Sequence, residues 1–227
     1  MSESSTTMIF AAASLTASFQ ELAQAFETSH PGSKIELHCA GTPQLVFQIR
    51  EGAPVDVFAS ADEMNMKRIV EMGKTVTTPA VFARNRLTIV TAKGNPLEIR
   101  ALADLDRPDL RVVLCGPTVP AGRYARQALA QAGVVVKSLS DEPSVKAVVS
   151  KVQLGEVDAG VVYSTDAVSA RDQVDAVAIP DDYNVDCAYP IVPLLAGANR
   201  RGGEAFVAFV TSEAGQMILQ RYGFTSP

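Results

Sequence analysis

The chain has 227 residues, a formal net charge of −5 and a hydrophobic fraction of 47%. This composition is typical of a folded protein rather than a disordered one, and the length suits one large domain or two small ones. The acidic balance argues against a nucleic-acid partner, which would need a basic face, and we expect none. An anion site in this chain would therefore have to be built from local dipoles rather than from net charge.

Targeting signals are not evident in the sequence. No apolar run approaches the roughly 18 residues that a membrane-spanning helix needs. The start of the chain, residues 1–7, is short and polar and lacks the basic-then-apolar layout of a signal peptide. Either the chain is cytosolic, or a native leader is absent from it. The cysteines, Cys39, Cys115 and Cys187, are scattered and odd in number, so we expect buried free thiols, although two of them could pair.

Short apolar runs alternate with amphipathic helical patterns, which predicts α/β layers with mostly parallel strands. The first block is expected to contain, in chain order, strand 8–13, helix 15–27, strand 34–39, helix 45–51, strand 55–59 and helix 63–72. Beyond it we expect strands 86–92 and 112–115, helices 123–132 and 145–154, strand 159–163, a strand-like segment 189–196 that two prolines interrupt, and a final helix 204–222.

These blocks predict two lobes. Residues 1–80 and 191–227 are expected to form lobe I, and residues 81–190 lobe II. A chain that crosses twice between lobes gives a hinge and a cleft, and clefts between domains are preferred sites for small ligands.

The strand-to-helix turns carry small or polar residues. Ser14 is expected as the N-cap of its helix, and Thr42 as the N-cap of another that Pro43 opens. Residues 120–122, which include Ala121, open a further helix, as do residues 143–145, which include Val145. Helix starts expose unpaired N–H groups at the carboxyl ends of strands and attract anions. A Ser or Thr before a helix is often only a cap, so a common site for these turns is a hypothesis.

Other polar residues give little support to catalysis. Tyr163 ends an apolar strand, where its phenol could donate to a ligand or simply be a core tyrosine with a wet tip. His30 is expected at a helix end, and His38 and Cys39 point to opposite faces of a strand, so they form no dyad. No cysteine–histidine cluster has zinc spacing. Four aspartates near strand ends are expected to be solvated caps, with a carboxylate pair as the alternative: Asp56, Asp62, Asp158 and Asp166.

Several strings together resemble one family over nearly the whole chain after Thr7. The sequence is similar to the periplasmic molybdate-binding proteins of ABC importers in segments 10–15, 52–62, 119–125, 160–167, 215–216 and 221–224. The resemblance implies a type II periplasmic-binding-protein-like fold, in which two α/β lobes are joined by hinge crossover strands around an interlobe cleft.

The resemblance also implies a ligand set. Ser14 matches the first serine ligand, Ala121 and Val145 match donors of main-chain N–H groups, and Tyr163 matches a phenol donor. The family's second serine lies in a serine-rich turn. Here Thr42 takes that position, which keeps a hydroxyl but adds a methyl group, and Pro43 removes a neighbouring N–H. No cofactor, no catalytic residue and no metal held directly by side chains is expected.

The function that the resemblance implies is capture of molybdate, or tungstate, by lobe closure and delivery to an ABC permease. The protein would be an extracytoplasmic monomer, periplasmic or anchored as a lipoprotein, whose leader is absent from this chain. One alternative is another anion, such as sulfate, phosphate or an organic acid, with an arginine fork from Arg84, Arg86 or Arg123. A leaderless cytosolic oxyanion sensor is a second alternative. A hydrolase built on Ser14 is a third, and it lacks a general base.

Overall fold

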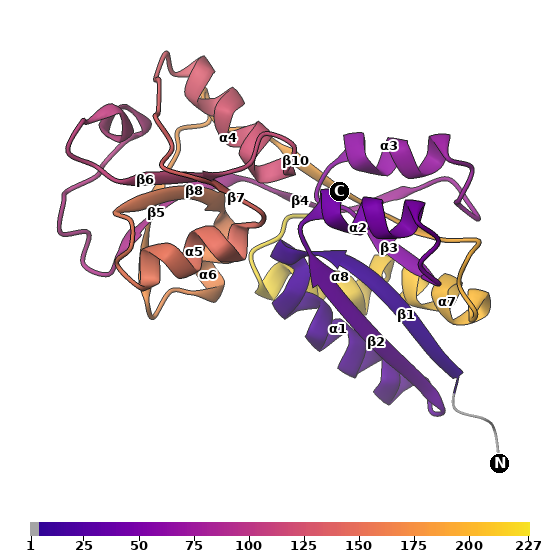
Figure 1. Cartoon of the computed structure of the whole chain (residues 1–227). Helices are drawn as coiled ribbons and strands as arrows, with labels where there is room; N and C mark the ends of the chain where they lie inside the picture. The colour runs from indigo at the N-terminus through magenta and orange to yellow at the C-terminus, as the bar shows by residue number, and fades with distance from the viewer. Residues whose placement is uncertain (1–4) are drawn as a thin grey trace. The chain divides into compact units, whose positions relative to one another are not determined.

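The computed structural model describes residues 5–227, which form two compact units (Figure 1). Unit 1 contains the described residues up to Arg84 together with Ala188–Pro227, and unit 2 is Asn85–Cys187. Unit 1 is therefore discontinuous in sequence, whereas unit 2 is one continuous stretch. The sequence analysis finds no signal-peptide layout in the polar segment 1–7. Residues 1–4 of this segment lie outside the described residues. Across residues 5–227, no helix combines the length and apolarity that crossing a bilayer requires.

Unit 1 is built on a five-stranded mixed sheet in the order β2-β1-β3-β10-β4. Strand β1 pairs in parallel with β2 and β3, and β10 pairs antiparallel with β3. The expectation of mostly parallel strands therefore holds for only part of this sheet. The strands are β1 (Ser5–Ala12), β2 (Ser33–Ala40), β3 (Val57–Ala59), β4 (Ala80–Asn85) and β10 (Cys187–Pro193).

Two groups of helices pack on the sheet of unit 1. Helices α1 (Thr16–Ser29), α7 (Arg200–Thr211) and α8 (Glu213–Arg221) contact one another, and α2 (Thr42–Arg50) packs with α3 (Glu63–Glu71). Helices α2 and α3 pack against the strands and form an apolar core with them. The buried residues of this core are Phe10, Leu45, Val46, Ile49, Val55, Phe58, Met66, Ile69, Val192 and Leu194. The first group is held by edge-to-face aromatic pairs, among them Phe19–Phe206 and Phe26–Phe206.

Unit 2 has its own five-stranded sheet in the order β7-β6-β8-β5-β9. Strand β6 pairs in parallel with β7 and β8, while β5 pairs antiparallel with β8 and β9. The strands are β5 (Leu87–Ala92), β6 (Val112–Cys115), β7 (Asp141–Glu142), β8 (Ala159–Tyr163) and β9 (Val174–Ala178). The helices are η2 (Leu102–Asp106), α4 (Pro120–Gln131), α5 (Val145–Gln153) and α6 (Ser164–Ser169).

The expected elements agree with most of this structure. Strands β6 and β8 have the predicted bounds, whereas the predicted helix 204–222 is two helices that part at Ser212. Strands β4, β7 and β9 and helix α6 were not expected. Cys39, Cys115 and Cys187, all within the described residues, form no disulfide, and Cys39 is only partly buried.

Candidate functional site

Ser14 follows strand β1, in the short 3-10 turn Ala13–Leu15 that leads into α1. The prediction that Ser14 is an N-cap is wrong. Ala12 is the N-cap of the turn, with φ −55° and ψ 145°, and Leu15 is the N-cap of α1. The Ser14 hydroxyl instead shares a 2.9 Å hydrogen bond with the Tyr189 hydroxyl, and Ser14 is 7% exposed. The Ser14 hydroxyl therefore makes no capping hydrogen bond to a helix N-terminus.

Thr42 has the equivalent place after strand β2. The register pairs Ala12 of β1 with Ala40 of β2, so Ser14 and Thr42 each lie two residues beyond the same rung of one parallel ladder. The N-cap of α2 is Gly41 rather than the predicted Thr42, and it supplies no side-chain cap. Thr42 is therefore the first residue of the helix, is 2% exposed, and has a main-chain N–H without an intrahelical acceptor. Unit 1 brings two hydroxyls to one edge of its sheet.

Ala121 lies in the first turn of α4, where the start of the helix has no side-chain cap. Val119 is the N-cap in an extended conformation, and Pro120 has no N–H to offer. The N–H of Ala121 is therefore the first helical donor, and it has no intrahelical acceptor. A Cβ atom at Gly122 would overlap the carbonyl oxygens of Cys115 and Gly116. The helix can begin this close to the end of β6 only because residue 122 is glycine.

Val145 opens α5 just beyond strand β7. Ser144 is the N-cap, and its Oγ accepts from Ala147 N at 3.3 Å. This cap satisfies the third N–H of the helix and leaves the first, that of Val145, outside the capping bond. Val145 is 3% exposed, so its side chain packs in the core while its N–H points out of the helix end.

Tyr163 is the last residue of β8, is 1% exposed, and is followed directly by α6. Strand β8 lies next to β6, which lies next to β7, and these three strands run parallel. Ala121, Val145 and Tyr163 therefore follow the carboxyl ends of three neighbouring strands of one sheet. This edge is where α/β sheets generally bind ligands. Unit 2 brings together the three site residues that the sequence assigns to it.

The aspartates near strand ends differ from the prediction of solvated caps. Asp56, Asp62 and Asp166 are at most 2% exposed. Asp62 does cap α3, because its Oδ1 accepts from Asn65 N at 2.8 Å. Asp56 instead ties three segments of unit 1 together: Oδ2 accepts from Met8 N and Oδ1 from Asn199 N, both at 2.7 Å. Two of these carboxylates thus organise the backbone of unit 1.

Asp166 is a buried carboxylate in the first turn of α6. Among the described residues, neither carboxylate oxygen has a hydrogen-bond partner of good geometry, and Lys146 Nζ lies 3.5 Å from Oδ1. Burial raises the pKa of Asp166 to about 6, although the Lys146 ammonium acts to lower it. Asp166 joins the start of α5 to the start of α6, the elements that follow Ser144 and Tyr163.

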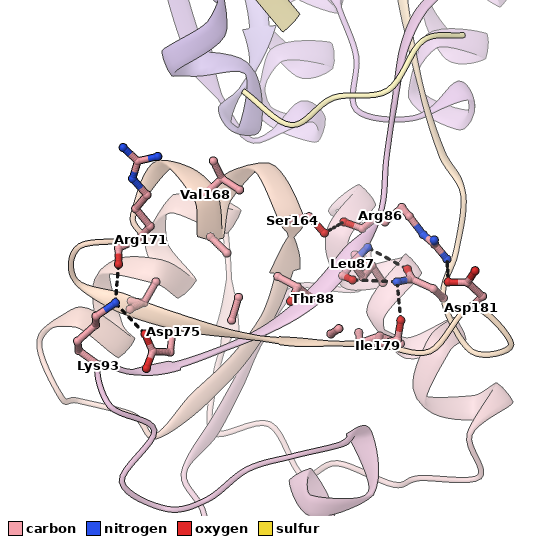
Figure 2. Close-up of a pocket in the computed structure, with 15 residues that line it drawn as sticks. Arg86, Leu87, Thr88, Lys93, Ser164, Val168, Arg171, Asp175, Ile179 and Asp181 are labelled. Atoms are coloured by element: carbon pink, nitrogen blue, oxygen red, sulfur yellow. Dashed lines mark hydrogen bonds and ion pairs between the residues drawn. The ribbon is translucent and has the colours of Figure 1, made fainter. Parts of the chain in front are cut away.

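A pocket of about 510 Å³ in unit 2 meets these turns only at the start of α6, where Ser164 lines it (Figure 2). Two of the basic side chains that line it form ion pairs with neighbouring carboxylates: Arg86 with Asp181 at 2.6 Å and Lys93 with Asp175 at 2.8 Å. In Figure 2 the guanidinium of Arg171 points away from the other labelled side chains. None of the five expected site residues lines this pocket. Paired surface ions around a hollow do not make a specific anion site.

Two α/β units with neutral donors at the carboxyl edges of their sheets define a binding protein for a small solute. The chain belongs to the bacterial extracellular solute-binding protein family, whose model matches residues 7–225. Over 220 residues it is 40% identical to the molybdate-binding protein ModA of Mycobacterium tuberculosis, with 97% of this chain and 84% of that protein covered.

Two solved structures show the same fold. The periplasmic molybdate-binding protein of Azotobacter vinelandii superposes with a TM-score of 0.84 at 20% identity, covering 97% of this chain and 99% of that one. The sulfate-binding protein SubI of Mycobacterium tuberculosis superposes with a TM-score of 0.88 at 18% identity, covering 98% and 87%. Because different anions appear in their names, the fold alone does not select the ligand.

One polar residue at the edge of the unit 1 sheet was missed. The sequence places Tyr189 only at the start of a strand-like segment, but its hydroxyl bonds Ser14 across 175 positions of sequence. No local pattern signals such a contact.

Proposed function

We propose that the protein captures molybdate or tungstate outside the cytoplasm and delivers it to an ABC permease, without catalysis and without a cofactor. The ligands are the hydroxyls of Ser14, Thr42 and Tyr163 and the main-chain N–H groups of Ala121 and Val145. Each unit supplies part of this donor set, and closure of the units on the anion is the proposed mode of capture. Family membership and the identity to a molybdate-binding relative support this proposal.

One observation carries the proposal: the helix starts at four of the five expected ligand positions lack side-chain caps. Among the described elements, the turn at Ser14 and helices α2, α4 and α6 begin without a side-chain cap. By contrast, α3, α7 and α8 are capped by Asp62, Asn199 and Ser212. Helix α5 is capped by Ser144, but this bond is made to Ala147 N and does not use the N–H of Val145. An uncapped helix start has N–H groups that need an acceptor, and an oxyanion provides several.

The donor set explains a preference for a fully ionised anion. Hydroxyls and N–H groups can all donate, whereas the proton that phosphate retains near neutral pH needs an acceptor. Leaving one buried polar group unsatisfied costs about 1–3 kcal/mol. Molybdate and tungstate carry no such proton, so a donor-only site favours them over phosphate. Sulfate is also a dianion, and only the size of the site discriminates against it.

A thermal-shift screen of the purified protein against molybdate, tungstate, sulfate and phosphate tests the ligand. An anion present at a thousand times its Kd stabilises the native state by about 4 kcal/mol. For a chain of this size we expect a rise in Tm of roughly 8–16 °C with molybdate and tungstate. If sulfate or phosphate alone raises Tm by a comparable amount, that anion is the ligand instead of molybdate. If none of the four anions raises Tm, the proposal is refuted.

Matched substitutions test the site residues by calorimetric titration. Ser14→Ala and Thr42→Ala each remove a proposed donor, and we expect molybdate affinity to fall by about tenfold or more. Ser18→Ala is the control, because Ser18 Oγ is buried close by and donates to Leu15 O at 3.1 Å without reaching the sheet edge. If both donor variants bind molybdate as tightly as the Ser18→Ala variant, the site assignment is wrong.

A further inference from the structure

Tyr189 reaches the donor edge of the unit 1 sheet from strand β10. Ile191 pairs with Ala59, the last residue of β3, and Ser60 N donates to Pro190 O at 2.9 Å. The antiparallel ladder therefore continues past the end of β3, and Tyr189 lies one residue further on. This position is at the edge where the parallel strands β1 and β3 end, next to the turn that contains Ser14.

Aromatic packing fixes the ring of Tyr189. The ring stands edge-on to Phe82, with centroids 6.4 Å apart at 88°, and edge-on to Phe224, with centroids 5.4 Å apart at 77°. Tyr189 is fully buried, so its side chain is held in one rotamer by its neighbours. The packing therefore fixes the position of the phenol oxygen, which lies 2.9 Å from Ser14 Oγ.

The direction of this hydrogen bond decides what Ser14 can offer. A serine hydroxyl has one proton and two acceptor lone pairs. If Ser14 donated to Tyr189, its proton would be used and only lone pairs would face an anion, which repels them. If Tyr189 donates to Ser14 Oγ, the Ser14 proton is free for the ligand, and the bond it makes is strengthened through the chain of hydroxyls.

We propose that Tyr189 is a positioning residue of the anion site, which donates to Ser14 Oγ and thereby commits the Ser14 proton to the bound oxyanion. This inference rests on the proposed role of Ser14 as a ligand. Tyr189 itself does not touch the anion. Its effect is to direct the Ser14 proton to the ligand, and so to add to the preference for anions that carry no proton.

A double-mutant cycle measured by calorimetric titration with molybdate tests the inference. Tyr189→Phe keeps the packed ring and removes the hydroxyl, and we expect it to weaken molybdate binding by about five- to tenfold. In the Ser14→Ala background the same change should alter affinity by less than about twofold, because the hydroxyl it orients is gone. Tyr183→Phe, at a tyrosine that is 40% exposed in unit 2, is the matched chemical control and should leave affinity unchanged.

Selectivity provides a readout that a purely structural role would not move. In Tyr189→Phe the Ser14 hydroxyl turns freely and can present a lone pair to the proton of hydrogen phosphate. The ratio of molybdate affinity to phosphate affinity should therefore fall relative to wild type. An unchanged ratio, or equal losses of affinity in the wild-type and Ser14→Ala backgrounds, overturns the inference. Failure of the proposed function is recognisable separately, because the wild-type protein would then not bind molybdate.

Discussion

The buried carboxylate of Asp166 makes the stability of the protein depend on pH in an uncommon direction. Asp166 is 1% exposed, and its nearest cation, Lys146, lies 3.5 Å away with 38% of its own side chain exposed. Burial raises the pKa of Asp166 from 3.8 to about 6. Because the folded-state pKa is higher than the unfolded one, the protonated acid favours the native state. The stabilising contribution is present at low pH and is lost as pH rises through about 6.

The size of this effect follows from the two pKa values. A shift of about two units corresponds to roughly 3 kcal/mol between the fully protonated and fully ionised limits. Between pH 4.5 and pH 7.5, the contribution of Asp166 to the free energy of unfolding should fall by about 2 kcal/mol. Asp166→Asn mimics the neutral acid at all pH values. We expect its stability relative to wild type to increase by about 2 kcal/mol over this range.

Urea unfolding of anion-free wild type and Asp166→Asn at several pH values measures this difference directly, and effects of all shared groups cancel. Asp158→Asn is a control of opposite sign, because hydrogen bonds from Arg111 lower the pKa of Asp158. The Asp158 variant should be less stable than wild type at pH 7.5, and the gap should narrow only below about pH 4. A difference between Asp166→Asn and wild type that does not vary with pH would refute the reasoning.

Three further substitutions probe the elements that carry the site. Gly122→Ala forces a methyl group against backbone carbonyls, and we expect a loss of at least about 2 kcal/mol in urea unfolding together with weaker molybdate binding in titration. Ser144→Ala removes the cap of α5 and should cost about 1 kcal/mol in the same unfolding assay, a loss that Ser144→Asp restores. Asp56→Asn places an amide N–H₂ group opposite a main-chain N–H, where the carboxylate oxygen accepted a hydrogen bond. The free energy of unfolding should fall by about 1–3 kcal/mol, which lowers Tm and leaves the anion selectivity unchanged.

The sequence predicts buried strands well because their signal is local. Strands β6 and β8 are continuous apolar runs whose residues are all buried, and their predicted bounds agree with the structure. Strand β9 lies at the sheet edge, has only one buried residue, Val174, and carries Asp175, so its signal is weak. The helix predicted over 204–222 has a continuous apolar pattern, but Ser212 breaks it by adopting an extended conformation and capping α8.

The candidate site could be predicted as a set of turns but not in its detail. Ser14 and Thr42 were expected as caps, and each lies inside its helix start, because a cap is set by the dihedral angles of single residues such as Ala12 and Gly41. The hydroxyls that the sequence assigns to capping are therefore not used as side-chain caps. The bond from Tyr189 to Ser14 depends on tertiary packing, which leaves no trace in sequence spacing.

The interrupted course of unit 1 has a consequence for the order in which the newly made chain folds. Strand β10 lies between β3 and β4 in the sheet, yet it is synthesised only after the whole of unit 2. Strand β4 therefore emerges from the ribosome with no neighbour to pair with, while the contiguous unit 2 can already close around its own sheet. The final segment also supplies Thr225, which bridges to Arg84. A nascent chain stalled between β4 and β10 thus exposes the facing edges of β3 and β4 without a partner strand, a form that chaperones and export factors can hold open.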